Sequence, residues 1–146
     1  MRRAGGEGIG IKKAAWLPFL WYNRVMEKIV DPIYKHPYLN YPEQQILKGL
    51  IQKVPSMYPA INKILLYGSK ARGDFLEESD IDILFVTDYA LPPRLKFEIY
   101  DAIFELEMEY DTVISTFFVT ADDFKTRKIP FLKHIQREGI TLWSRE

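Results

Sequence analysis

The 146-residue chain contains no cysteine and only two histidines. The absence of cysteine excludes a disulfide framework, thiolate catalysis and a cysteine-based zinc site, and so few histidines exclude a histidine-rich metal centre. The chain also has no net charge, because 20 Lys and Arg balance 20 Asp and Glu. A neutral protein has no overall field that draws it onto nucleic acid, so we expect no extended nucleic-acid footprint.

Apolar runs long enough to span a membrane are also missing. Residues 14–22 form a run of nine residues that Pro18 interrupts, whereas a transmembrane helix needs about 20. Basic residues precede this run, as in a secretory signal, but no small-x-small cleavage pattern follows it. We therefore expect a cytoplasmic protein that does not bind a membrane.

The first 25 residues differ in composition from the rest of the chain. They contain four glycines, Gly5, Gly6, Gly8 and Gly10, which favour a disordered terminus. We expect residues 1–25 to be a flexible N-terminal extension and residues 26–146 to be a single domain. A related hypothesis is that Met26 is the physiological start of the chain.

The remainder has the composition of a folded globule. Hydrophobic residues make up 47% of the sequence and aromatic residues 14%, which suits one domain with a single core. The spacing of apolar residues, together with residues that favour helix starts and ends, predicts helices over 42–54, 93–106 and 120–139, the last interrupted at Pro130. Apolar runs predict strands over 61–67, 81–87, 111–119 and 140–143. This order predicts an α/β (α+β) fold, a small mixed β-sheet with helices packed on it.

Two carboxylates mark the second predicted strand. Asp80 and Asp82 stand two residues apart, so their side chains point to the same face. Two like charges side by side are unfavourable unless a cation lies between them. Carboxylate oxygens suit Mg²⁺, which is usually held by one or two carboxylates together with substrate phosphates. The pair indicates a metal site at the edge of the core, and the alternative is a solvated strand end.

A Gly-Ser pair follows the first predicted strand. Gly68 lets the backbone approach a ligand closely, and Ser69 can offer a hydroxyl and an amide to a phosphate. Alone, such a pair most often forms only a turn. Its conjunction with Asp80 and Asp82 is more specific, because both parts lie on adjacent apolar strands with residues 69–79 between them. Together these residues indicate a site for a metal and a phosphate.

This conjunction resembles the catalytic signature of the nucleotidyltransferase (DNA polymerase β-like) superfamily: a strand, Gly-Ser, a spacer and Asp-hydrophobic-Asp. Residues 68–73, Gly-Ser-Lys-Ala-Arg-Gly, followed by residues 79–82, Ser-Asp-Ile-Asp, are similar in particular to the minimal nucleotidyltransferases, small prokaryotic proteins reduced to the catalytic domain. The resemblance covers residues 42–146. It implies a polymerase β palm-like fold and Mg²⁺-dependent transfer of a nucleoside monophosphate, with AMP from ATP as the expected group.

The resemblance also implies a set of metal ligands. Asp80 and Asp82 would hold Mg²⁺, with two ions expected. Asp111, at the start of the third predicted strand, would be the third metal carboxylate and would take the proton of the acceptor hydroxyl. The alternative for Asp111 is that it only ends the preceding helix and turns the chain.

The nucleotide-binding residues implied by the resemblance lie around the Gly-Ser pair. Gly68 and Ser69 would hold the terminal phosphates. Arg72, and as a weaker candidate Lys70, would offset the charge on the pyrophosphate. The alternative for Arg72 is a surface ion pair with Asp74 or with residue 77.

The motif does not identify the molecule that accepts the nucleotide. Similar minimal nucleotidyltransferases are often paired with a small helical HEPN-domain protein, and some act as antitoxins by adding AMP to a tyrosine of that partner. The resemblance therefore implies a HEPN-type partner, and an oligomer is also compatible with the sequence. One alternative is a non-catalytic module that masks its partner by contact, with aromatic residues 16–22 facing that partner. Another is a small-molecule nucleotidyltransferase.

Overall fold

The computed structural model describes residues 32–76 and 78–145. The elements that carry the fold are α2 (Tyr41–Met57), β1 (Ile61–Tyr67), α3 (Ser69–Arg72), β2 (Ile81–Thr87), α4 (Pro93–Tyr110), β3 (Ile114–Thr120), α5 (Ala121–Thr126), α6 (Pro130–Glu138) and β4 (Ile140–Ser144). The expectations for residues 1–25 and for Met26 lie outside the described residues. No helix in the described part of the chain is long and apolar enough to cross a membrane.

The four strands form one mixed sheet in the order β3-β2-β1-β4. β1 is antiparallel to both β2 and β4, whereas β2 and β3 are parallel and α4 connects them. A parallel pair needs such a crossover because a short turn cannot return the chain to the same end of the sheet. The predicted α+β class with a small mixed sheet is therefore confirmed.

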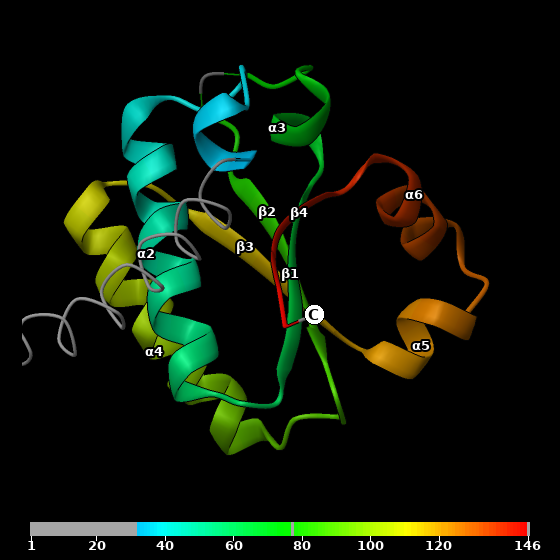
Figure 1. The fold of residues 1–146 in the computed structure, drawn as a ribbon. Coiled ribbons are helices and arrows are strands. Elements are labelled where there is room, and N and C mark those ends of the chain that lie inside the picture. Colours follow the sequence, from blue (N-terminus) through cyan, green and yellow to red (C-terminus); the bar gives the residue numbers. More distant parts are fainter. Residues whose placement is uncertain (1–31, 77, 146) are drawn as a thin grey trace, which may run out of the picture.

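Helices cover both faces of this sheet (Figure 1). α2 and α4 pack on one face and bury the larger hydrophobic cluster, which includes Ile46 and Leu106 from the helices and Phe85 from β2. α5 and α6 lie on the opposite face, where Leu132 and Ile135 of α6 contact a smaller cluster that includes Leu84. The sheet is thus buried between two layers, and α3 lies at the end where β1 leaves it.

The first long helix begins with a capping box. The Asn40 side chain accepts a hydrogen bond from the Glu43 backbone N–H at 3.0 Å, and Glu43 Oε2 accepts one from the Asn40 backbone N–H at 2.9 Å. The predicted helix over 42–54 ends too early, because α2 continues through Pro55 to Met57. Pro55 removes one backbone donor, but the Tyr58 N–H still donates to the Val54 carbonyl at 3.0 Å, so the last turn closes around the proline.

The third strand starts later than its apolar pattern predicts. Asp111 adopts a left-handed conformation, with φ 49° and ψ 51°, at the end of α4, and β3 begins only at Ile114. A left-handed residue reverses the chain direction, so it cannot be part of an extended strand. The predicted start of the next helix is confirmed at Thr120, whose side chain accepts a hydrogen bond from the Asp123 N–H at 3.1 Å.

Candidate active site

The two halves of the sequence motif meet at one end of the sheet. β1 and β2 are antiparallel neighbours, and their register places Tyr67 opposite Asp82. Gly68, directly after β1, therefore lies beside the start of β2. The side chain of Asp82 is on the same face as Leu84, two residues further along β2, and this is the face that α6 covers.

Gly68 is packed against the carboxylate of Asp82. Its backbone has φ 75° and ψ −156°, a region that residues other than glycine rarely adopt. A Cβ atom at this position would overlap Asp82 Oδ2 and lie 3.0 Å from Asp82 Cγ. Glycine is thus required here for two independent reasons, its backbone conformation and the space occupied by the carboxylate.

The Asp82 carboxyl group has a pKa above its ordinary value. Partial burial is the main cause, the nearby negative charge of Asp80 adds to it, and the positive charge of Arg72 opposes it. Asp80 itself is exposed. A cation would stabilise the ionised form of Asp82, which burial and the Asp80 carboxylate both disfavour. The motif therefore assembles a small acidic site beside the turn at Gly68.

The donor set fits a hard divalent cation that completes its coordination with substrate. Among residues 32–76 and 78–145, no three His, Cys, Asp or Glu side chains lie close enough together to hold one ion. Asp80 and Asp82 offer two carboxylates, and Mg²⁺ commonly uses one or two carboxylates plus phosphate oxygens and water. The chemistry of the two residues suits Mg²⁺ bound together with a nucleotide.

The structure does not bring Asp111 into a three-carboxylate cluster with Asp80 and Asp82. Asp111 is exposed and ends α4, and its N–H donates to the Glu107 carbonyl. On β3 the residue paired with Asp82 is Ser115, which offers no charge. In this conformation Asp111 has the capping position that was the alternative to its catalytic role, and that catalytic role stays a prediction.

The short helix α3 carries the two predicted cationic phosphate ligands in different environments. Arg72 is exposed, and its Nε lies 3.1 Å from Asp74 Oδ2 while its NH1 lies 3.8 Å from Glu138 Oε2. The hydrogen bond to Asp74 is the main reason that the Arg72 pKa is raised, with smaller contributions from Glu138 and Asp82. Arg72 thus forms the surface ion pair considered as its alternative and also lies within electrostatic range of Asp82.

Lys70 does not fit the role of a phosphate ligand. Its Nζ lies 2.6 Å from Glu43 Oε1, with the two side chains only 3% and 8% exposed. The same ammonium lies 3.9 Å from the centre of the Phe75 ring. An ammonium that is buried and paired with a carboxylate cannot reach a ligand at the surface, so this expectation is corrected: Lys70 anchors α3 to the start of α2.

A cavity of about 160 Å³ opens between the Gly68 turn and α6. Its walls are Tyr67, Gly68, Arg72, Phe131, His134, Ile135 and Glu138. Sequence reasoning missed the four residues that come from α6. The sequence indicated one of them, because Phe131 is a large aromatic residue next to the apolar positions Leu132 and Ile135 of the helix. In the structure those two residues are buried, whereas Phe131 is 38% exposed.

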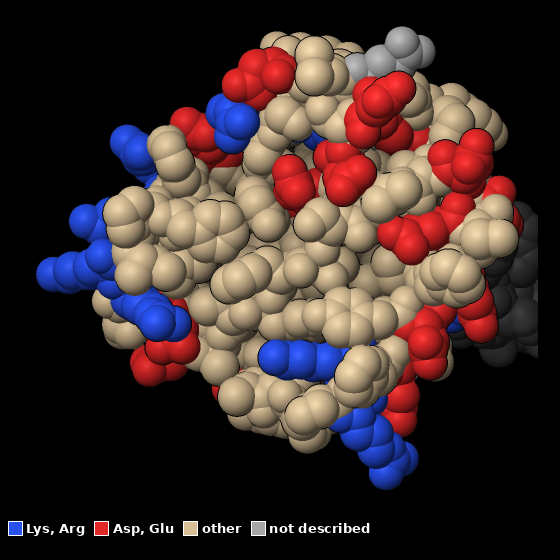
Figure 2. Space-filling model, turned by 180° about the vertical axis from the view of Figure 1, so that it is seen from behind, with Lys and Arg blue, Asp and Glu red and all other residues tan. Residues whose placement is uncertain are grey.

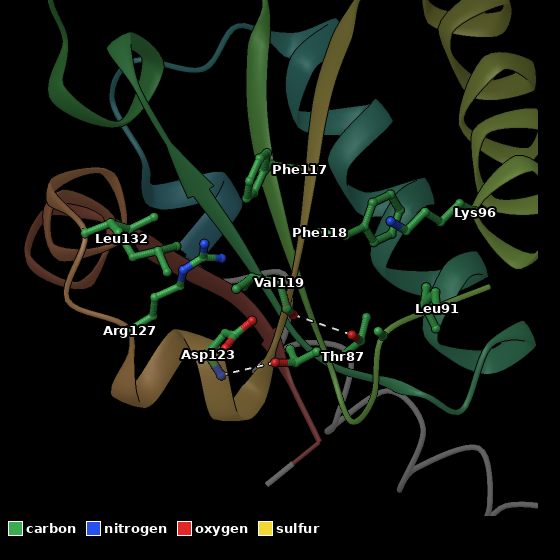
Figure 3. Close-up of a pocket in the computed structure, with 12 residues that line it drawn as sticks. Thr87, Leu91, Lys96, Phe117, Phe118, Val119, Asp123, Arg127 and Leu132 are labelled. Atoms are coloured by element: carbon green, nitrogen blue, oxygen red, sulfur yellow. Dashed lines mark hydrogen bonds between the residues drawn. The ribbon is translucent and has the colours of Figure 1, made fainter. Parts of the chain in front are cut away.

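A second cavity, of about 180 Å³, lies at the other end of β2 and β3 (Figure 3). Thr87, Phe118 and Arg127 are among its lining residues. Thr87 is five positions along β2 from Asp82, which corresponds to about 16 Å at the usual rise per strand residue. This cavity is therefore separate from the acidic site.

The comparisons with known proteins agree with this geometry. Residues 50–146 match the family model described as polymerase beta, nucleotidyltransferase. The chain belongs to the polymerase β-type nucleotidyltransferase family. The resemblance of the sequence motif to the nucleotidyltransferase superfamily is thereby confirmed, and the protein is an enzyme of the nucleotidyltransferase class.

One curated relative is MJ0604 of Methanocaldococcus jannaschii, a candidate protein adenylyltransferase. It is 35% identical over 105 residues, which cover 69% of this chain and 98% of the relative. A solved toxin–antitoxin complex with AMP-PNP contains a chain of similar fold, with 19% identity, a TM-score of 0.52 and coverage of 68% of this chain and 74% of that one. A complex of an AMPylated Shewanella oneidensis HEPN toxin with its nucleotidyltransferase antitoxin matches at 18% identity and a TM-score of 0.48, covering 69% and 71%.

Proposed function

We propose that this protein transfers AMP from ATP to a hydroxyl group of a HEPN-type partner protein, in a reaction that depends on Mg²⁺. The observation that carries the proposal is the packing of Gly68 against Asp82, with Asp80 next to it. This arrangement places a turn with glycine backbone freedom directly beside an acidic pair. Such a site can hold a nucleotide's phosphates and a divalent cation together.

In the proposed reaction the acceptor oxygen forms a bond to the α-phosphorus of ATP. The bond from that phosphorus to the bridging oxygen breaks, pyrophosphate leaves, and the acceptor hydroxyl loses its proton. Mg²⁺, when bound, would supply positive charge that offsets the charge of the phosphates. Asp80 and Asp82 would hold the cation, and the Gly68–Ser69 turn would hold the triphosphate.

Arg72 and Asp111 complete the proposed machinery. The exposed Arg72 guanidinium, already within electrostatic range of Asp82, can exchange its contact with Asp74 for the leaving pyrophosphate. Asp111 is the proposed acceptor of the hydroxyl proton. To act there it must approach the acidic pair more closely than in the present conformation, so acceptor binding at the end of α4 is part of the proposal.

A protein acceptor is supported by the surface of α4. Phe97, Phe104 and Met108 recur on its outward side and are 65%, 59% and 70% exposed. Exposed apolar patches of this kind often mark protein–protein contacts. Acidic residues flank these three side chains, and Figure 2 shows Asp and Glu in the upper and right-hand parts of this face, with Lys and Arg at its left and lower edges. The surface suits an acceptor protein with apolar residues between lysines and arginines.

The designation of the curated relative as a candidate protein adenylyltransferase also supports a protein acceptor. The choice of a HEPN-type partner follows from the resemblance of residues 68–82 to minimal nucleotidyltransferases that are paired with such proteins. A similar fold in a toxin–antitoxin complex is compatible with that choice.

The direct test is a transfer assay with a HEPN-type protein from the same organism as the acceptor. Purified protein, partner and Mg²⁺ are incubated with ATP labelled at either the α- or the γ-phosphate, and the products are separated on a denaturing gel. We expect label on the partner from α-labelled ATP alone, and its loss in the Asp80→Asn, Asp82→Asn double variant. Asp122→Asn, which removes an exposed carboxylate on α5, is the matched control and should keep activity.

A second candidate function is a module that neutralises its partner by contact alone. It is favoured by the position of Asp111, which ends α4 and does not form a three-carboxylate cluster. In that case the double variant would still suppress the partner and no label would be transferred. Transfer of label to a small molecule without any protein present would indicate the third alternative, a small-molecule nucleotidyltransferase.

A further inference from the structure

The cavity beside the Gly68 turn is continuous with the proposed phosphate site. Gly68 and Arg72 line it, and both also adjoin the carboxylate of Asp82, one by packing and the other by charge. From this end the cavity extends to α6. A molecule whose phosphates occupy the Gly68 turn would therefore place its remaining part either in this cavity or in solvent.

Aromatic side chains form much of the cavity wall. The rings of Tyr67 and Phe131 are 5.5 Å apart and nearly perpendicular, at 85°. Phe117 of β3 supports Phe131 from another side, at 5.1 Å and 75°. These contacts hold the Phe131 ring in place although 38% of the residue is exposed. A fixed and partly exposed aromatic ring offers a surface on which a flat ligand can stack.

Charged groups at the same cavity come from Arg72 and from the end of α6. Glu138 Oε1 lies 3.7 Å from His134 Nδ1, and Glu138 Oε2 lies 3.8 Å from Arg72 NH1. The Glu138 carboxylate would repel a phosphate, whereas it can accept a hydrogen bond from an amino group. This combination of apolar walls and a few polar groups is usual for a pocket that binds an organic ring.

The size of the cavity points to the same class of ligand. Its volume of about 160 Å³ leaves room for a bicyclic heterocycle. The phosphates would stay at the Gly68 turn.

We infer that this cavity is the nucleobase site of the enzyme, in which Phe131 stacks on the base and Tyr67 closes the wall behind it. The inference rests on the proposed function, because it takes the ligand to be a nucleoside triphosphate. It adds a role for α6, which holds the base while the sheet end holds the phosphates. It also makes Phe131 a residue that determines affinity for the nucleoside part of the substrate.

The test compares two ligands that share phosphates but differ in the base. Dissociation constants for ATP and for inorganic tripolyphosphate are measured by calorimetry with Mg²⁺, for the full chain and for Phe131→Ala. We expect the variant to bind ATP about tenfold more weakly, since base stacking on an aromatic ring is lost. Its affinity for tripolyphosphate should stay unchanged. Tyr89→Ala, which removes an exposed aromatic ring in the loop after β2, is the matched control and should change neither constant.

Phe131 also packs on Tyr67 and Phe117, so Phe131→Ala could weaken ATP binding by disturbing the cavity wall. Two further variants separate this effect from the loss of base stacking. Phe131→Leu keeps an apolar side chain without the ring and should also lose ATP affinity, whereas Phe131→Tyr should retain it. Equal ATP affinity in all three variants and the wild type would overturn the nucleobase assignment alone. A parallel loss of tripolyphosphate affinity would also overturn it. Wild-type protein that binds neither ligand would overturn the proposed function itself.

Discussion

The ammonium of Lys70 and the carboxylate of Glu43 form a buried ion pair, with Nζ and Oε1 2.6 Å apart. This contact joins α3, next to the Gly68 turn, to the first turn of α2. Glu43 uses its other oxygen in the capping box with Asn40, so one side chain both starts a helix and holds the loop. His36 adds a second anchor, since its Nε2 lies 2.8 Å from the Lys70 carbonyl oxygen. These two contacts of Lys70 hold α3, and with it the Gly68 turn, in place beside Asp82.

Removing one partner of this pair should destabilise the fold. Glu43→Gln leaves the buried Lys70 ammonium without its counter-charge, and Lys70→Met leaves the buried Glu43 carboxylate without its own. For either variant we expect a loss of about 3–5 kcal/mol in the free energy of unfolding. Urea denaturation measures the change. Lys53→Met is the control, because the Lys53–Glu105 pair is exposed and should contribute little to stability. Equal effects of the buried and exposed variants would contradict the anchoring role of Lys70.

Gly68→Ala should impair both stability and transfer. The positive φ strains any other residue, at a cost of about 1–3 kcal/mol, and the new Cβ displaces the Asp82 carboxylate. Removing that carboxylate in the Gly68→Ala, Asp82→Ala double variant relieves the clash but not the strain. Denaturation of the four proteins in this cycle should therefore show a smaller cost of Gly68→Ala when Asp82 is absent. Additive effects would show that the two residues do not touch.

Asp82→Asn should stabilise the metal-free protein while abolishing transfer. Folding raises the pKa of Asp82, mainly through burial and then through Asp80. The contribution of this group to stability is therefore complete below the pKa of the unfolded chain and is lost as the pH rises through the raised folded value. At pH 7 we expect Tm to be higher in the variant by roughly 1–3 °C, with no difference in strong acid.

The same variant gives a test of metal binding. Mg²⁺ with ATP should raise the Tm of the wild type, because a ligand that binds only the folded state stabilises it. Asp82→Asn should show little of this rise. Protons compete with the cation for Asp82, so the Mg²⁺-induced shift in the wild type should weaken as the pH falls through the raised pKa. A shift that is insensitive to both the variant and the pH would place the cation elsewhere.

Asp111→Asn tests whether Asp111 accepts the proton of the acceptor hydroxyl or only ends α4. Asparagine tolerates the left-handed backbone at φ 49°, so the end of α4 should keep its structure and Tm should change little. If Asp111 accepts the proton of the hydroxyl, the initial rate of AMP transfer should fall about 10²-fold or more. An unchanged rate would show that Asp111 is only a helix cap.

Phe104→Asp should disrupt the proposed acceptor surface. Phe104 is 59% exposed, so the substitution should not perturb the core. We expect weaker association with the HEPN-type protein and a higher KM for it, with no change in the dissociation constant for ATP. Surface plasmon resonance and the labelled-ATP assay measure these two effects. Normal partner affinity in this variant would exclude the α4 surface as the contact.

Most of the fold could be predicted from residue patterns. The strand bounds Ile61–Tyr67 and Ile81–Thr87 agree with the predicted ones, because apolar runs bounded by polar residues report a buried strand directly. The prediction failed at Pro55 and at Asp111. Whether a proline ends a helix depends on the hydrogen bonds that the residues after it can make. Asp111 has a left-handed backbone and β3 therefore starts later, but no glycine at this position indicated such a conformation in the sequence.

By itself the sequence predicted that Asp80 and Asp82 share a face and that Gly68 follows the preceding strand. Alternation along a strand is a local property, so it can be read without knowing the fold. Only the tertiary structure decided that Lys70 is buried with Glu43, that Arg72 remains at the surface, and that α6 lies against the Gly68 turn. These relationships join segments far apart in the chain, and packing alone selects which of their side chains meet.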